Sequence, residues 1–259
     1  MKKFWLGATA LVAISIAAPA SAADLGRPYT KAAPMMATMY DWSGFYVGIN
    51  GGGGWSHKCW DVTNILGVTL PAALAEGCHD ASGGVVGGQI GYRWQMASWV
   101  FGLEAAGEWA NLRGSNASLL LPGTILNVTD QSKINALGFF TGQVGYAWNN
   151  VLLYVKGGAA VASDKYYGFL TVNNFALDNA SETRVGGVIG AGLEYGLTPN
   201  IILGVDYQHA FMGTRAVSFA PNVFVPGLPL ARIENIRQDV DVVTARLSYK
   251  FGGPVVARY

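Results

Sequence analysis

Apolar and polar residues alternate with a period of two through most of the chain that follows Trp42. Between residues 151 and 163, Val151, Leu153 and Val155 lie at odd positions, whereas Lys156 lies at an even one. Successive side chains of a β-strand point to opposite faces, so this alternation predicts strands with one apolar and one polar face. Eight such segments can be marked, at residues 44–55, 83–95, 98–111, 132–146, 151–163, 183–195, 200–212 and 238–251.

The connections between these segments alternate in length. Three are short, at residues 95–98, 148–151 and 196–200. Four are long, at residues 56–82, 112–131, 164–182 and 213–237. A tilted strand of about 9–11 residues crosses a bilayer, and outer-membrane barrels have short periplasmic turns and long outer loops. The pattern therefore predicts an all-β fold, an eight-stranded antiparallel up-and-down transmembrane β-barrel over residues 41–252.

Composition supports a membrane location. Charged residues make up 13% of the chain, about half the usual share, while 51% of residues are hydrophobic. After residue 22 no run of residues approaches 18 consecutive apolar positions, which excludes a helical membrane protein. An apolar chain without a spanning helix is typical of a transmembrane barrel, whose apolar residues are diluted by alternation.

The N-terminus has the pattern of a secretory signal peptide over residues 1–22. Lys2 and Lys3 precede an apolar stretch, and an A-x-A motif ends at Ala22. Residues 23–40 contain two prolines and no periodicity, which indicates an extended periplasmic segment. Without Lys2 and Lys3 the balance of 17 basic and 16 acidic residues becomes 15 and 16, so charge gives no argument for nucleic-acid binding.

Aromatic residues cluster near the short-turn end of the predicted strands. Rings at this height are typical of the interfacial girdle of a membrane barrel, where they lie between headgroups and hydrocarbon. A soluble sandwich with an aromatic core would not place its rings at one end of every hairpin. The residues concerned are Phe45, Tyr92, Trp94, Trp99, Tyr146, Trp148, Tyr195, Tyr249 and Phe251.

The same alternation assigns charged residues to the lumen. We expect these charges to pair, because a charge in a confined interior must be paired or hydrated. A lumen of eight strands is just wide enough to be filled by side chains, which favours a salt-bridged plug over a narrow selective pore. Leu137 and Phe139 also fall on the lumen side. The predicted lumen charges are Arg93, Glu104, Glu108, Lys156, Glu194, Asp206, Arg246 and Lys250.

The chain has two cysteines, Cys59 and Cys78, both in the first long connection. In an exported protein they are expected to form a disulfide. His57 and His79 flank them and raise the hypothesis of a metal site, but the spacing matches no usual zinc pattern. No metal and no cofactor is therefore predicted.

His209 lies on the predicted lipid face near the outer end of its strand. A lipid-modifying barrel enzyme would need a serine and an acid beside it, yet Asp206 points inward by parity and no serine adjoins His209 in sequence. A lone interfacial histidine is favoured, so no catalytic residue is predicted and we expect no enzyme.

Several motifs resemble a known family. The run Tyr40-Asp41-Trp42-Ser43-Gly44-Phe45-Tyr46-Val47-Gly48, with the glycines that follow it and the closing Leu247-Ser248-Tyr249-Lys250-Phe251, resembles the alphaproteobacterial outer-membrane immunogenic protein family. The resemblance covers the whole chain after the signal peptide. It implies an eight-stranded outer-membrane barrel of the porin-like, surface-antigen type in a Gram-negative bacterium.

The end of the chain departs from the barrel pattern. Barrels of this type usually finish on the aromatic residue of the last strand, which the assembly machinery reads. Here residues 253–259 form a short extension after Phe251. The assembly signal is therefore either the internal pair Tyr249 and Phe251 or the terminal Tyr259.

Three functional hypotheses follow. The first is a structural protein that supports envelope integrity and lets small solutes pass. The second is a surface protein whose outer loops bind a ligand such as haem, or a host surface. The third and weakest is the lipid-modifying enzyme. Expected partners are outer-membrane lipid and lipopolysaccharide, the barrel assembly machinery, and peptidoglycan or host surfaces, with no nucleic acid among them.

Overall fold

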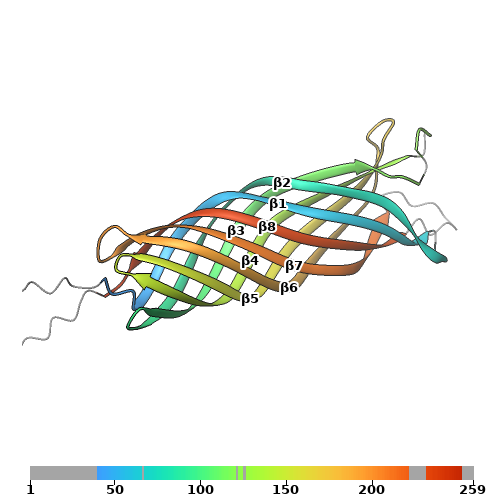
Figure 1. Ribbon diagram of the computed structural model, residues 1–259. Helices are drawn as coiled ribbons and strands as arrows, with labels where there is room; N and C mark the ends of the chain where they lie inside the picture. The colour runs from blue at the N-terminus through green and yellow to red at the C-terminus, as the bar shows by residue number, and fades with distance from the viewer. Residues whose placement is uncertain (1–39, 66, 121, 125–126, 222–231, 253–259) are drawn as a thin grey trace, which may run out of the picture. The chain divides into compact units, whose positions relative to one another are not determined.

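The structure, a computed structural model, describes residues 40–65, 67–120, 122–124, 127–221 and 232–252. Each strand pairs antiparallel with the next, and the last pairs with the first, so the sheet closes into a barrel (Figure 1). This arrangement confirms the predicted fold class. The strands are β1 (Gly44–Ile65), β2 (Val68–Met96), β3 (Trp99–Ala117), β4 (Val128–Trp148), β5 (Val151–Leu170), β6 (Ala176–Gly196), β7 (Ile201–Pro221) and β8 (Arg232–Lys250).

Three predictions concern parts of the chain outside the described residues. These are the signal peptide at residues 1–22, almost all of the segment 23–40, and the extension 253–259 with Tyr259. The described residues contain no helix that is both long and apolar enough to cross a membrane.

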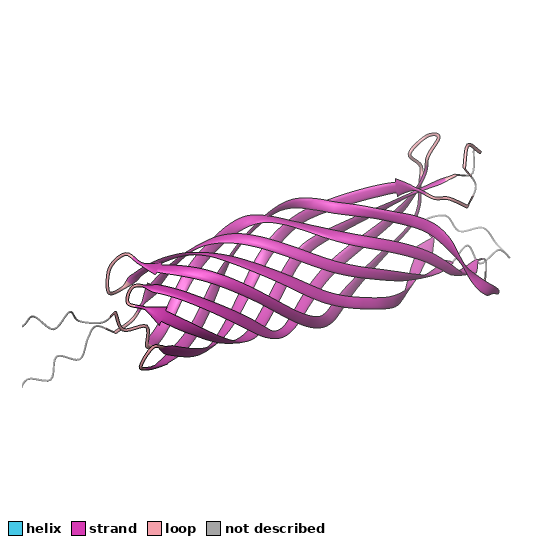
Figure 2. Cartoon of the chain, in the orientation of Figure 1, coloured by secondary structure: helices cyan, strands magenta, loops and turns pink. Residues whose placement is uncertain are grey.

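The strands are longer than predicted, and much of what was predicted as long outer loops is strand. Residues 56–65 continue β1 and residues 68–82 continue β2, so the first predicted loop is an extended hairpin (Figure 2). The predicted strand ends were wrong because they were placed where outward-facing apolar residues end, and the strands continue beyond those residues. Beyond Trp55 the outward positions of β1 are His57, Cys59 and Asp61, although backbone pairing continues.

The short turns match the prediction. Residues 97–98 join β2 to β3, residues 149–150 join β4 to β5, and residues 197–200 join β6 to β7. Ala97 and Asn149 have φ of 55° and 54°, the left-handed conformation that two-residue hairpin turns require. These tight turns fix the register of each hairpin, and with it the face to which every side chain points.

The outward face carries an apolar band that ends well below the strand tips. Leu153, Leu203 and Phe101 are exposed on this face, as predicted. On β5 the band runs from Val151 to Val161, and the next outward residue is Ser163. The aromatic residues predicted for the girdle lie at the short-turn end of this band, where Phe251 packs against Phe45 with ring centroids 5.7 Å apart. The band is wide enough for one membrane crossing, so the outer part of each strand lies beyond the membrane.

The backbone pairing between two neighbouring strands, β6 and β7, is interrupted from the outer edge of the apolar band outward. Between β6 and β7, Gly187 pairs with Phe211 and Asn179 pairs with Ala220, but the intervening residues 180–186 and 212–219 have no described partners across this boundary. Residues 213–216 of β7 are exposed along it. The β2–β3 ladder also ends early, at Ser82 and Arg113, although both strands continue outward.

Candidate functional site

The lower half of the lumen holds a compact charge network, here called the lower network. Arg93 donates to both carboxylate oxygens of Glu194, at 2.5 and 3.0 Å. Glu104 accepts from Lys156 Nζ at 3.3 Å and from Arg246. All of these side chains are buried. The lower network consists of Arg93, Glu104, Lys156, Glu194, Asp206 and Arg246, which are six of the eight predicted lumen charges.

The other two predicted lumen charges are buried but do not pair as expected. Lys250 donates to the backbone carbonyl of Asp41 and lies over the ring of Tyr40, 5.2 Å from its centroid. Glu108 is 3% exposed, and neither of its carboxylate oxygens has a hydrogen-bond partner in the part of the chain that is described. These two residues therefore face the lumen side, as alternation predicts, but they are not members of the ion pairs that join the other six.

Two tyrosines extend the lower network. The hydroxyl of Tyr46 donates to Glu104 at 2.7 Å, and that of Tyr154 donates to Asp206 at 2.9 Å. Each ring occupies space left by a glycine, because a Cβ at Gly91 would lie 2.5 Å from Tyr46 and one at Gly192 would lie 2.3 Å from Tyr154. These glycines let a narrow lumen hold large aromatic side chains.

An apolar layer lies directly above the lower network. Leu137 and Phe139, which alternation placed on the lumen side, are buried within it. Along β5 the inward residues change from Lys156 to Ala160 and Ala162, and along β8 they change from Arg246 to Val242 and Val240. The layer consists of Ala81, Val85, Ala110, Leu112, Ile134, Leu137, Phe139, Ala160, Ala162, Val188, Ala210, Met212, Val240 and Val242.

A second set of buried polar residues, the upper network, lies above the apolar layer. Lys58 Nζ lies 2.8 Å from Asp164 Oδ1, and both side chains are fully buried. Arg184 donates to the carbonyl of Ile236 at 2.8 Å. An aromatic cluster around Trp60, Tyr166 and Phe219 follows. Sequence reasoning assigned all of these residues except Arg184 to loops, although inward positions there still alternate with outward ones. Arg184 lies at the end of the predicted strand 183–195 and was not singled out.

Five charged residues meet at the outer end of the lumen and form what we call the mouth cluster. Arg232 Nε lies 2.8 Å from Asp178, and Arg232 Nη2 lies 3.0 Å from Asp130. Arg232 Nη1 lies 2.6 Å from Glu234 and 3.3 Å from Glu76. Burial and neighbouring carboxylates raise the pKa of Asp130 and of Glu234 above the ordinary carboxyl value, although Arg232 opposes this. No sequence pattern pointed to this cluster, because its members come from four strands.

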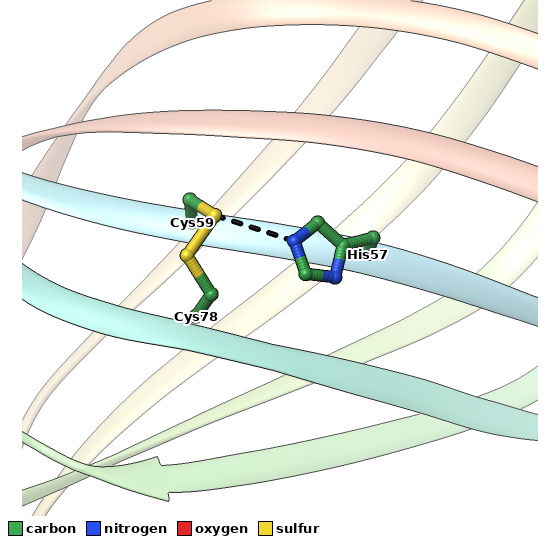
Figure 3. Close-up of side chains that lie close together, drawn as sticks. All are labelled: His57, Cys59 and Cys78. Atoms are coloured by element: carbon green, nitrogen blue, oxygen red, sulfur yellow. Dashed lines mark hydrogen bonds between the residues drawn. A yellow bond between two sulfur atoms is a disulfide. The ribbon is translucent and has the colours of Figure 1, made fainter.

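The predicted disulfide is present. Cys59 and Cys78 are bonded across paired positions of β1 and β2, outside the apolar band. His57 Nε2 lies 3.4 Å from Cys59 Sγ (Figure 3). Both sulfurs are used in the disulfide, so neither is available as the thiolate that a metal site of this kind needs.

His209 lies on the outward face, as predicted. Its Nδ1 is 2.7 Å from Asp241 Oδ1, which also accepts from the hydroxyl of Tyr207 at 2.6 Å. Asp206 points into the lumen instead, where it belongs to the lower network. The contacts of His209 include an acid but no serine, so the nucleophile of a hydrolytic triad is missing from this group.

The sequence is similar to known outer-membrane proteins over most of its length. A family model described as an outer membrane protein β-barrel domain matches residues 8–251. The 25 kDa outer-membrane immunogenic protein of Brucella abortus is 28% identical over 220 residues, which are 85% of this chain and 89% of the relative. The 31 kDa outer-membrane immunogenic protein of Brucella melitensis is 28% identical over 251 residues, covering 93% and 98%.

Among solved structures, the outer membrane protein OprG from Pseudomonas aeruginosa has a similar fold. The TM-score is 0.51 at 14% sequence identity, and the match covers 82% of this chain and 97% of OprG.

Proposed function

Because this chain belongs to the outer membrane protein β-barrel domain family, we propose that it is a structural protein of the outer membrane whose lumen is closed by its own side chains. In this role it strengthens the envelope and presents its outer strands at the cell surface. It is not an enzyme, and its partners are outer-membrane lipid, lipopolysaccharide and the barrel assembly machinery.

The observation that carries this proposal is the layered lumen. A hydrated ion or polar solute needs a continuous aqueous path, and a narrow apolar constriction excludes water. Here the apolar layer around Leu137, Phe139 and Met212 lies between two polar networks. The lower network is itself occupied by ion pairs, such as Arg93 with Glu194. Both arrangements favour a plug over a pore.

The outer parts of the strands favour a role at the surface. They continue beyond the apolar band, and the Cys59–Cys78 disulfide joins the longest hairpin there. Surface exposure agrees with the names of the Brucella relatives, which are immunogenic outer-membrane proteins. Strands that extend past the bilayer hold surface segments more rigidly than loops would.

A deletion strain tests the proposal. Loss of the protein should increase sensitivity to detergents and large antibiotics, which a weakened envelope admits, and uptake of small hydrophilic solutes should not fall. Expression of the wild-type chain should restore resistance. Slower solute uptake with an unchanged envelope barrier would refute the structural role and favour a pore.

A further inference from the structure

The mouth cluster has an excess of negative charge that the rest of the lumen lacks. With every group ionised, its four carboxylates face one cation, Arg232. The lower network and Glu108 have four carboxylates against three cations. In the upper network Lys58 and Arg184 face Asp164 and Glu182. Only the mouth cluster therefore leaves three negative charges uncompensated within the described lumen.

Among the described residues, the printed ion pairs of these carboxylates involve no cation other than Arg232. His79 is a buried base that contacts this region through Asn116 and Ser132. Burial lowers the pKa of His79, so it is neutral at pH 7. Ser118 donates to Glu76 Oε1 at 3.0 Å and adds no charge.

The geometry of the carboxylates matches a cation site. One carboxylate oxygen from each of Glu76, Asp130 and Glu234 lies within 4.8 Å of the others. The exposed fractions of these side chains are 3%, 0% and 0%. Hard divalent cations such as calcium bind six to eight oxygens, several of them from carboxylates.

Unpartnered oxygen atoms indicate that a ligand belongs here. Glu234 Oε2 and Asp130 Oδ2 are buried and have no hydrogen-bond partner in the described residues. The other oxygen of each carboxylate contacts Arg232. A buried carboxylate oxygen without a partner is costly, and the cost is removed by a proton or by a metal ion.

We propose that the mouth cluster binds one calcium ion between the carboxylates of Glu76, Asp130 and Glu234. A divalent ion would reduce the excess of three negative charges to one. The three ligands come from β2, β4 and β8, which are not neighbours in the sheet, and Arg232 extends the contacts to Asp178 on β6. The ion and Arg232 together would therefore connect β2, β4, β6 and β8 across the outer end of the barrel and hold that end closed.

Terbium luminescence tests this site directly. Terbium replaces calcium at oxygen sites and emits when a nearby tryptophan is excited. The ring centroids of Trp60 and Phe219 are 5.8 Å apart, and the Phe219 centroid is 4.5 Å from Arg232 Cζ. Trp60 is therefore close enough to the cluster to sensitise the bound terbium. Purified protein in a zwitterionic detergent should show saturable emission at pH 7.5. Millimolar calcium should displace the terbium, because calcium sites of extracellular protein modules typically have dissociation constants of about 0.1–1 mM.

Variants locate the ion. Glu234→Gln and Asp130→Asn should each reduce terbium emission about tenfold or more, since each removes a charged ligand. Glu108→Gln, which changes a buried carboxylate of the lumen outside the cluster, should leave emission unchanged. Calcium should also raise the urea midpoint of wild-type unfolding above that in EDTA, and it should not do so for Glu234→Gln.

Two results would overturn the proposal. One is the absence of any calcium-dependent change in emission or urea midpoint up to 10 mM calcium, which is about ten times the largest expected dissociation constant. The other is emission that Glu234→Gln and Asp130→Asn leave unchanged. If calcium has no effect, a urea midpoint that falls as pH rises from 5 to 8 would show that protons, instead of a metal ion, neutralise the carboxylates of the cluster.

Discussion

At the scale of single residues, two buried glutamates of the lumen have opposite environments. Glu194 accepts two hydrogen bonds from Arg93, whereas Glu108 has no partner in the described structure. Burying a charge is costly unless it is paired, so their removal should have opposite effects on the free energy of unfolding.

Glu194→Gln should lower the free energy of unfolding by about 3–5 kcal/mol, because it leaves Arg93 charged and buried without its carboxylate. The matched variant Glu108→Gln should leave this free energy unchanged or raise it. Urea titration of the folded barrel in vesicles, followed by gel mobility, measures both. Equal losses for the two variants would show that Glu108 is paired in solution, and the description of the lower network would be wrong.

The disulfide gives a second prediction at this scale. Denatured but unreduced protein should contain no reactive thiol, because Cys59 and Cys78 are bonded to each other. Reduction should lower the free energy of unfolding by up to about 3 kcal/mol, the chain-entropy value for a loop of this length. A thiol count of two before reduction would contradict the bonded pair.

Alternation predicted which residues face the lumen, but it did not predict their partners. Glu104 and Arg246 lie 142 positions apart in sequence and on strands that do not pair. Strand tilt brings such residues together, and tilt is a property of the closed barrel that no single strand encodes. For the same reason alternation could not indicate that Lys250 contacts the backbone of Asp41, or that Glu108 lacks a hydrogen-bond partner among the described residues.

At the scale of elements, each strand has a lower part that faces lipid and an outer part that faces water. Val155 on β5 lies near the middle of the apolar band and is 62% exposed on the outward face. Thr183 on β6 is also outward-facing but lies beyond Val185, where the band ends. The two positions therefore differ in the solvent that surrounds them.

Val155→Arg should lower the free energy of unfolding by about 2–4 kcal/mol, the cost of a basic residue on a lipid face near the bilayer midplane. Thr183→Arg should cost about 0–1 kcal/mol, because a strand position at or beyond the interface remains hydrated. Unfolding in vesicles of defined lipid measures both. Similar costs at the two positions would show that the outer part of the wall is also immersed in lipid.

The sequence predicted the lower parts of all eight strands and missed the outer parts. Alternation between apolar and polar residues arises where one face of a strand contacts lipid. In the outer parts of the strands, water lies outside and both polar and apolar side chains lie inside, so the pattern is lost. Residues such as Lys58, Trp60 and Tyr166 still point inward there. The mouth cluster was missed for this reason, since Glu76, Asp130 and Asp178 all lie in segments predicted as loops.

At the scale of the whole molecule, the arrangement is a closed wall around a filled interior. The lumen is filled in layers from the short-turn end to the outer end. The lower network comes first, and the apolar layer and the upper network follow it. The aromatic cluster and the mouth cluster lie beyond them. An eight-stranded barrel has just enough interior for such a filling. Envelope support, more than transport along the axis, is the role that this interior suits.

Conductance across a planar lipid bilayer tests this closed interior most directly. The purified, folded protein should insert without producing stepwise current in concentrated potassium chloride, because the apolar layer around Leu137, Phe139 and Met212 leaves ions no hydrated path. Insertion is checked separately by the different gel mobility of heated and unheated protein recovered from the membrane. Steady ion currents of uniform step size from the inserted wild-type protein would contradict the account.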